Sequence, residues 1–237
     1  MTSVIVFVLL SLIFCFIWGK SLWYGSEKSA VMRNSVFFLM SATKGDYGKI
    51  KSLLLSCLYY LGAILGIASF CFYYRLNFME LLTFNKEAVY LTVAGIFSAI
   101  SITNIITGIY QEFILRKKID FQKEVLSIPW IDGVMKLPKW LIPLSPGIAG
   151  FFEESFFRGA VLGILLYVFQ VPFLVALVIS TGLFIFQQTL QVKNIHQAVI
   201  IGSGCIAISI AGGILVLLTG SIIPAAIAHA AFVVFYF

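Results

Sequence analysis

Long apolar runs separated by short polar connections are the feature that most limits how this chain can fold. Seven runs are expected to form helices, at residues 4–19, 52–74, 88–110, 147–170, 172–191, 198–218 and 222–237. A helix that crosses a bilayer needs about 20 apolar residues, and it satisfies its own backbone hydrogen bonds in lipid. Charged residues make up only 11% of the chain, against about 25% in a soluble domain. The sequence therefore predicts an all-α, polytopic transmembrane helix bundle with about seven spans, and it excludes a soluble globular enzyme.

The length of the chain suits one continuous membrane domain. Residues 1–144 are expected to supply N-terminal transmembrane helices with basic loops, and residues 145–237 a helical core that carries the candidate site. The first run is interpreted as a retained span because no basic residue precedes it, and it gives the weakest indication of belonging to the core bundle. The apolar patch 36–40 is too short to span, and residues 111–140 mix charges with tryptophans, so both are predicted to lie at the membrane interface.

Basic residues gather in the loops that follow the first and third runs. The residues concerned are Lys20, Lys28, Arg33, Lys44, Lys49 and Lys51 in the first loop and Arg116, Lys117, Lys118, Lys123, Lys136 and Lys139 in the second. Cytoplasmic loops carry the excess of Lys and Arg, so both loops are predicted to be cytoplasmic. We therefore expect an integral protein of a prokaryotic plasma membrane, with its N-terminus outside and its C-terminus cytoplasmic. Topology explains the net charge of +6, so the expected partner is the lipid bilayer and no nucleic acid is expected.

One short segment, residues 151–159, places three charges inside a span. Charges within the bilayer are expensive to bury and are therefore functional candidates. Glu154 and Arg158 are four residues apart on one helix face, in the order that favours an ion pair. Glu153 is turned by roughly 100° from Glu154 and has no basic partner on its own face. A buried ion pair that sets helix register explains Glu154 and Arg158 but not Glu153, which is suited to act as a general base.

Histidine and glutamine side chains supply further candidates. His229 lies among alanines in the seventh run, where small side chains let another helix approach closely. Gln187, Gln188 and Gln191 end the fifth run. Gln191 is expected to cap that helix, whereas Gln188 lies deeper and is expected to form hydrogen bonds in a cavity. His196 is expected to be an exposed loop residue.

The predicted depths of these polar groups agree with one another. Glu153 and Glu154 lie one to two turns from the inner end of their span, Gln188 lies about one turn from the inner end of the next, and His229 lies near mid-span. They are therefore predicted to meet in a cavity in the inner half of the membrane, open toward the cytoplasm.

The segment Glu153-Glu154-x-x-x-Arg158 resembles the EExxxR motif of a protease family. This family comprises the CAAX-processing and bacteriocin-processing (CPBP, or Abi) intramembrane proteases and includes the type II CAAX prenyl endopeptidases. The resemblance covers roughly residues 145–233. It implies a multi-helix membrane protein in which the first glutamate of the motif, here Glu153, activates the attacking water.

Two later motifs of that family are matched in part. Phe184 falls on the phenylalanine of its FxxxH motif, but Gln188 stands in place of the histidine. His229 matches the histidine of its HxxxN-type motif, and Val233 stands where asparagine is usual. Gln188 is able to hydrogen-bond a water or an oxyanion but not to take up a proton, and the Val233 side chain does neither.

The leading hypothesis is an intramembrane endopeptidase that hydrolyses a peptide bond by glutamate-activated water. Its substrate would be a peptide or membrane-protein segment that enters from the cytoplasmic leaflet. His229, with Gln188, would stabilise the carbonyl oxygen, while Glu154 and Arg158 would hold Glu153 in position. No zinc motif such as HExxH is present, so no metal or other cofactor is expected.

Two other functions compete with this hypothesis. A catalytically impaired family member, acting as a membrane peptide-binding or immunity/regulatory protein, is motivated by Gln188 and Val233. A proton-coupled transporter is disfavoured, because the first three spans carry no interior charge and such transporters usually place polar or broken helices in both halves.

Overall fold

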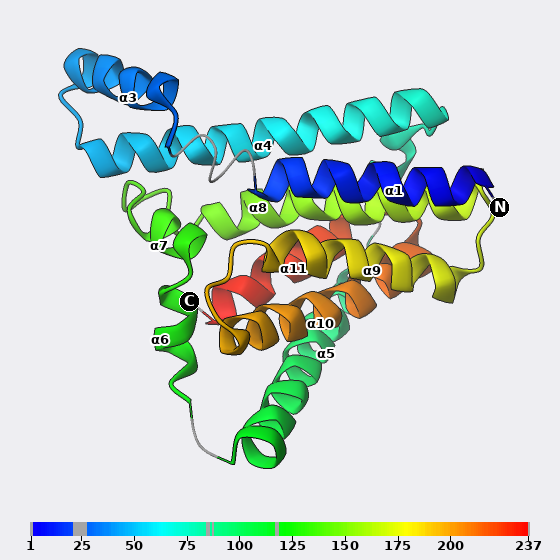
Figure 1. Cartoon of the computed structure of the whole chain (residues 1–237). Coiled ribbons are helices and arrows are strands. Elements are labelled where there is room, and N and C mark those ends of the chain that lie inside the picture. Colours follow the sequence, from blue (N-terminus) through cyan, green and yellow to red (C-terminus); the bar gives the residue numbers. More distant parts are fainter. Residues whose placement is uncertain (1, 21–27, 84–85, 87, 117–118, 237) are drawn as a thin grey trace.

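Helices make up every regular element in the described part of the protein. The computed structural model describes residues 2–20, 28–83, 86, 88–116 and 119–236 (Figure 1). Within these ranges, four helical stretches are long and apolar enough to cross a membrane: Ser3–Lys20, Tyr47–Tyr74, Ala88–Leu115 and Ile195–Thr219. Phe173–Thr189 and Ile223–Tyr236 are shorter apolar helices. The prediction of an all-α transmembrane bundle is therefore confirmed.

Each of the seven predicted runs has a helical counterpart. The elements are α1 (Thr2–Phe16), α4 (Tyr47–Tyr74), α5 (Ala88–Ile109), α8 (Ser145–Glu154), α9 (Phe173–Thr189), α10 (Ile195–Thr219) and α11 (Ile223–Tyr236). The fourth run does not remain an α-helix throughout. After α8 it continues as two π-helical stretches, η4 (Ser155–Leu162) and η5 (Ile164–Val168). The wider π-helical turns begin directly after the two glutamates, and such turns often occur at functional sites.

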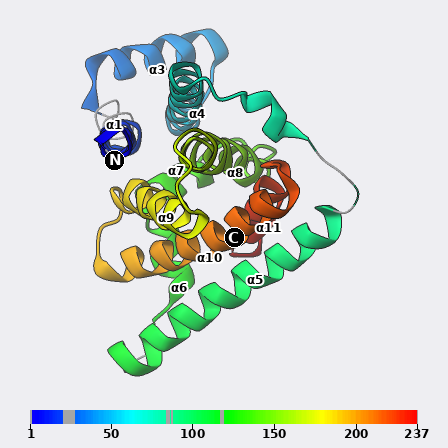
Figure 2. The ribbon, with the colours of Figure 1, turned by 90° about the vertical axis from the view of Figure 1, so that its right-hand side faces the viewer.

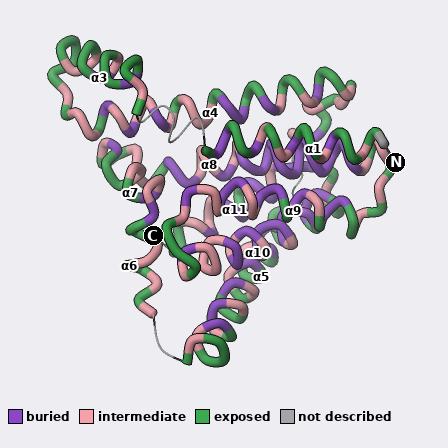
Figure 3. Tube along the Cα trace, in the orientation of Figure 1, coloured by how far each residue is buried: buried purple, intermediate pink, exposed green. Residues whose placement is uncertain are grey.

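The α8–η4–η5 stretch runs through the middle of the bundle. Seen along its axis, α1 and α4 lie on one side of it and α9, α10 and α11 on the other (Figure 2). All eight residues of η4 are buried, so the purple of the buried tube is continuous there (Figure 3). The charges of the fourth run are therefore carried by the most enclosed helix of the bundle rather than by one that faces lipid.

The first helix belongs to the bundle, although its membership was the least strongly indicated by the sequence. Phe7, Cys15 and Trp18 are fully buried. Phe14 packs at 4.9 Å, between ring centroids, on Phe156 of the central stretch. Hydropathy alone did not reveal this because an apolar side chain is equally suited to lipid and to a protein interior.

Three short helices occupy the two segments predicted to lie at the interface. They are α3 (Ala30–Thr43), α6 (Phe121–Leu126) and α7 (Pro129–Met135). α3 is longer than the apolar patch 36–40 because Ser29 caps its first turn. It packs on the start of α4 and leaves Phe37 and Phe38 exposed, as a helix lying in the interface would.

The connections alternate between two ends of the bundle. α3, α6, α7 and the C-terminus lie toward one end, whereas the N-terminus lies at the other (Figure 1). This is the alternation that the predicted topology requires. Lys117 and Lys118 lie outside the described residues. The assignment of the first end to the cytoplasm stays a prediction.

The contact between α1 and α4 generates a test of the bundle. A Cβ atom at Gly66 would overlap the ring of Phe14, and Trp18, Phe70 and Phe156 surround that ring. Gly66→Leu is therefore expected to lower the free energy of unfolding by about 1–3 kcal/mol, the usual cost of overpacking.

Thermal unfolding in detergent would measure the effect of this change. Gly182→Leu on α9 is the matched control, because nothing lies within 4 Å of a Cβ at Gly182. Equal melting temperatures for the two variants would contradict the observed packing of α1.

Candidate active site

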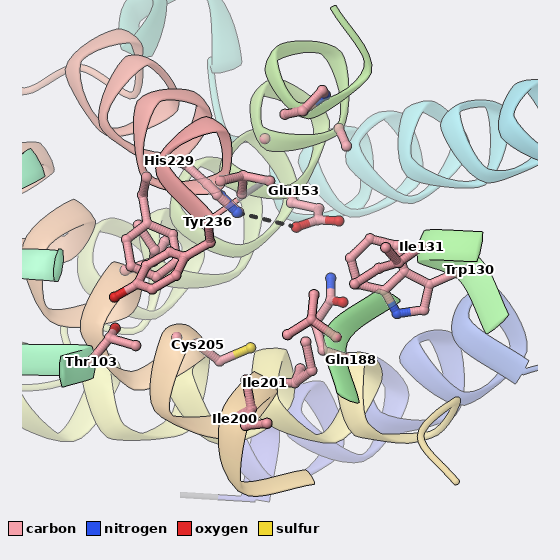
Figure 4. Close-up of a pocket in the computed structure, with 18 of the residues that line it drawn as sticks. Thr103, Trp130, Ile131, Glu153, Gln188, Ile200, Ile201, Cys205, His229 and Tyr236 are labelled. Atoms are coloured by element: carbon pink, nitrogen blue, oxygen red, sulfur yellow. Dashed lines mark ion pairs between the residues drawn. The ribbon is translucent and has the colours of Figure 1, made fainter. Parts of the chain in front are cut away.

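A cavity of about 570 Å³ has three of the five predicted site residues at its wall. Glu153 reaches it from α8, Gln188 from α9 and His229 from α11, so three segments that are separate in sequence meet there (Figure 4). α4, α5, α6, α7 and α10 supply most of the rest of the wall, and Tyr59 is one of the residues that α4 contributes. Glu153, Gln188 and His229 therefore share one cavity, whereas Glu154, which was expected there too, does not line it.

Glu154 and Arg158 form the ion pair expected from their spacing. The Arg158 Nε atom lies 3.1 Å from Glu154 Oε2, and both side chains are buried. Arg158 also donates a 2.8 Å hydrogen bond from Nη2 to Ser209 Oγ on α10, and its guanidinium carbon lies 4.8 Å from the centre of the Phe184 ring. A Cβ at Gly212 would lie 2.9 Å from Glu154 Oε2, so α10 needs glycine there to admit the pair.

His229 joins the two glutamates. Its Nδ1 atom lies 2.9 Å from Glu154 Oε1, and its Nε2 atom lies 3.7 Å from Glu153 Oε2. Glu154 is paired with Arg158 and is therefore ionised, and an ionised carboxylate only accepts hydrogen bonds. The Nδ1 atom must then carry the proton, which leaves the Nε2 lone pair directed toward Glu153 in the neutral ring.

Close approach of α8 to α11 makes this geometry possible. A Cβ at Gly150 would lie 3.3 Å from His229 Cγ and 3.4 Å from the backbone nitrogen of Ala230. Among the alanines near His229, Ala225, Ala226 and Ala228 are buried, and a Cβ at Gly147 of α8 would lie 3.9 Å from the Cβ of Ala230. The small residues noted in the sequence thus bring the histidine to the carboxylates.

Sequence reasoning missed one neighbour of Glu153. The hydroxyl of Tyr59, on α4, donates a 2.6 Å hydrogen bond to Glu153 Oε1. Gln187 Nε2 donates to the same hydroxyl oxygen at 3.2 Å, and Trp18 Nε1 donates to the Tyr59 carbonyl at 2.9 Å. Tyr59 is one of ten tyrosines and has no motif around it, so no signal in the sequence separated it from the others.

The three glutamines have different surroundings. Gln188 lines the cavity, and Figure 4 shows its amide below Glu153 and directed toward it. Gln191 Nε2 donates to the carbonyl of Gly19 at 2.9 Å and so ties the end of α9 to the segment after α1. Val233, at the second departure from the family pattern, also lines the cavity.

His196 is not the exposed loop residue that the sequence predicted. It lies in the first turn of α10, is half-buried, and its Nδ1 atom lies 2.8 Å from the Tyr110 hydroxyl. The structure does not bring it to the cavity wall.

Hydrogen bonds and ion pairs among the polar side chains hold the candidate site together. Within the described ranges, no group of three or more His, Cys, Asp or Glu side chains is placed to hold a metal ion. His229 contacts both Glu153 and Glu154, while Arg158 pairs with Glu154 and Tyr59 hydrogen-bonds Glu153. The arrangement provides a carboxylate and an imidazole nitrogen, both directed into one cavity, for proton transfer.

The ion pair generates a stability prediction. Arg158→Met would leave the buried Glu154 carboxylate without its cation, so we expect a loss of about 3–5 kcal/mol in the free energy of unfolding. The double variant Glu154→Gln/Arg158→Met removes both charges and is expected to recover part of this loss. Thermal or denaturant unfolding of both proteins would measure the difference. A double variant less stable than Arg158→Met would contradict this role of the pair.

Residues 136–235 match the family model described as "Type II CAAX prenyl endopeptidase Rce1-like". No curated protein matches the chain, and neither does any solved structure. The match spans all five candidate site residues, whereas α1, α3, α4 and α5 lie outside it. The resemblance to the CPBP intramembrane proteases is thereby confirmed over residues 136–235, which are similar to the Rce1-like branch of this protease family.

Proposed function

We propose that this protein is an intramembrane endopeptidase in which the Glu153 carboxylate activates a water molecule for attack on a peptide bond. One observation carries the proposal: Glu153 Oε2 and His229 Nε2 lie 3.7 Å apart at the wall of a cavity, while Glu154 holds the other side of the imidazole. A water that contacts both atoms is held by a base on each side. The match to a protease family supports the same reaction class.

The proposed reaction begins with proton transfer from this water to Glu153 Oε2. The water oxygen forms a bond to the carbonyl carbon, and the electron pair of the carbonyl double bond moves to its oxygen. When the intermediate collapses, the C–N bond breaks and the amine nitrogen receives the proton, either from Glu153 directly or by way of His229 Nε2. General acid–base catalysis of this kind contributes about 10²–10⁴-fold to a rate.

Two side chains in the cavity are placed to stabilise charge during the reaction. The Gln188 amide is directed toward the Glu153 region, where it would donate a hydrogen bond to the developing oxyanion (Figure 4). His229 lies between the carboxyl groups of Glu153 and Glu154 and is placed to carry a proton during the reaction.

The proposed substrate is a peptide or membrane-protein segment that enters from the cytoplasmic leaflet. The cavity is lined in part by residues of α6 and α7, of which α6 carries Lys123 of the second basic loop. Its volume of about 570 Å³ is within the range of pockets that enclose a small ligand. Its wall combines apolar residues, such as Ile201 and Phe232, with small polar residues on α5.

The first test uses Glu153→Gln in the purified full-length protein. The probe is a quenched-fluorescent peptide with a CAAX terminus, in prenylated and unprenylated forms, as the name of the matched family suggests. We expect kcat to fall at least 100-fold, because the amide is unable to accept the proton of the water. Glu112→Gln changes an exposed glutamate in the same way and serves as the control. Equal cleavage by Glu153→Gln and the unmodified protein would contradict the assignment. So would tight binding of the peptide by both proteins with cleavage by neither.

A second prediction concerns the cavity as the substrate site. Gly108 on α5 lines the cavity, and nothing lies within 4 Å of a Cβ placed there. Gly108→Leu would therefore fill part of the cavity without disturbing the packing, and we expect KM to rise at least fivefold with a small loss of stability. Gly182→Leu, on the exposed face of α9, is the control in steady-state kinetics. An unchanged KM in Gly108→Leu would show that the substrate binds elsewhere.

A further inference from the structure

We propose that Tyr59 is a positioning residue for Glu153, and that Gln187 sets the direction in which the Tyr59 hydroxyl donates. This inference rests on the proposed function, because it assigns which oxygen of Glu153 acts as the base. Both the α4 helix and the α1 helix behind it lie outside the region that matches the protease family.

The direction of the hydroxyl follows from its two neighbours. Gln187 Nε2 is a donor and lies 3.2 Å from the Tyr59 oxygen, so that oxygen accepts from the amide. The hydroxyl has one proton, and the remaining partner is Glu153 Oε1 at 2.6 Å. This is the length of a charge-assisted O–H···O⁻ bond, which is stronger than a bond between neutral groups.

The two carboxylate oxygens of Glu153 therefore have different roles in the proposed site. Oε1 is held by Tyr59, whereas Oε2 lies 3.7 Å from His229 Nε2 at the cavity wall. A carboxylate held through one oxygen is unable to rotate freely, so Oε2 stays where a water reaches it together with the histidine. A base held within hydrogen-bond reach of its substrate is what proton transfer requires.

Trp18 fixes the tyrosine in turn. Its indole stacks on the Tyr59 ring with centroids 4.9 Å apart, and its Nε1 atom donates to the Tyr59 carbonyl at 2.9 Å. Trp18 is fully buried. The tyrosine is thus held by its ring, its backbone and its hydroxyl, as a residue that positions another group needs to be.

The test is Tyr59→Phe, which keeps the ring on Trp18 and removes only the hydroxyl. We expect kcat to fall roughly 10- to 100-fold, the loss of a hydrogen bond to a charged group, with KM within about twofold. The acid limb of the pH–rate profile should move to higher pH, because a carboxylate without its donor is ionised less readily. Tyr73→Phe, at an exposed position of the same helix, is the control and should leave both unchanged. If KM rose by the same factor as kcat fell, and the pH–rate profile did not move, Tyr59 would be merely structural.

Gln187→Leu completes a double-mutant cycle. Alone it frees the hydroxyl to turn away from Glu153, and we expect kcat to fall roughly 2- to 10-fold. In the Tyr59→Phe background it should have no further effect, because Gln187 acts through the tyrosine. Full additivity of the two losses would overturn the proposed role of Gln187.

A labelling experiment decides the inference without turnover. Dicyclohexylcarbodiimide reacts with protonated carboxyl groups in apolar surroundings, and mass spectrometry would follow its adduct on Glu153 across a pH series. Labelling of Tyr59→Phe should persist to higher pH than labelling of the unmodified protein, even if the proposed protease activity fails its own test with Glu153→Gln. Coincident labelling profiles would overturn the inference while leaving that activity standing.

Other titratable or charged groups also surround Glu153, and Tyr59→Phe alters none of them. They are Tyr60 on α4, Glu154 and Arg158 on its own stretch, Cys205 on α10 and His229 on α11.

Discussion

Two adjacent carboxylates inside an apolar helix bundle each need a compensating partner, and this constraint governs the centre of the protein. Removing an ion from water into a protein interior costs several kcal/mol unless charges and hydrogen bonds compensate it. Glu154 is compensated by Arg158 at 3.1 Å and by the Nδ1 proton of His229 at 2.9 Å. Glu153 accepts from the Tyr59 hydroxyl and has the Gln188 amide beside it, but it has no cation as close as Arg158, and His229 Nε2 is more distant. The two glutamates therefore differ chemically, and Glu153, whose charge is compensated less, faces the cavity.

Small residues make room for this arrangement. Gly212 admits the ion pair between α10 and the central stretch, and Gly150 lets α8 approach the histidine on α11. Without a hydrophobic driving force between helices in lipid, such close backbone contacts and interhelical hydrogen bonds hold a bundle together. The glycines that make room for the proposed site thus also allow the close helix contacts, so a substitution at either one would disturb the fold and the site together.

The sequence predicted the features that depend on local spacing or on hydropathy. The spans follow from apolar length, and the Glu154–Arg158 pair follows from an i,i+4 spacing that a helix always brings to one face. Tyr59, Ser209 and Trp18 were not predictable in this way, because their roles arise only when α4, α10 and α1 pack on the central stretch. His196 was misjudged for the same reason: its partner, Tyr110, lies 86 positions away.

The two departures from the family pattern change where protons travel in the proposed site. Gln188 donates and accepts hydrogen bonds but does not take up a proton, and the Val233 side chain does neither. Proton transfer at the cavity wall then depends on Glu153 and His229, which face each other at 3.7 Å. A single acid–base pair functions only if its geometry is firmly held. Here Glu154 and Arg158 hold the histidine, while Tyr59, backed by Trp18 and Gln187, holds the glutamate. In the proposed mechanism the N-terminal helices, which lie outside the family match, therefore help to position the base rather than serving only as a membrane anchor.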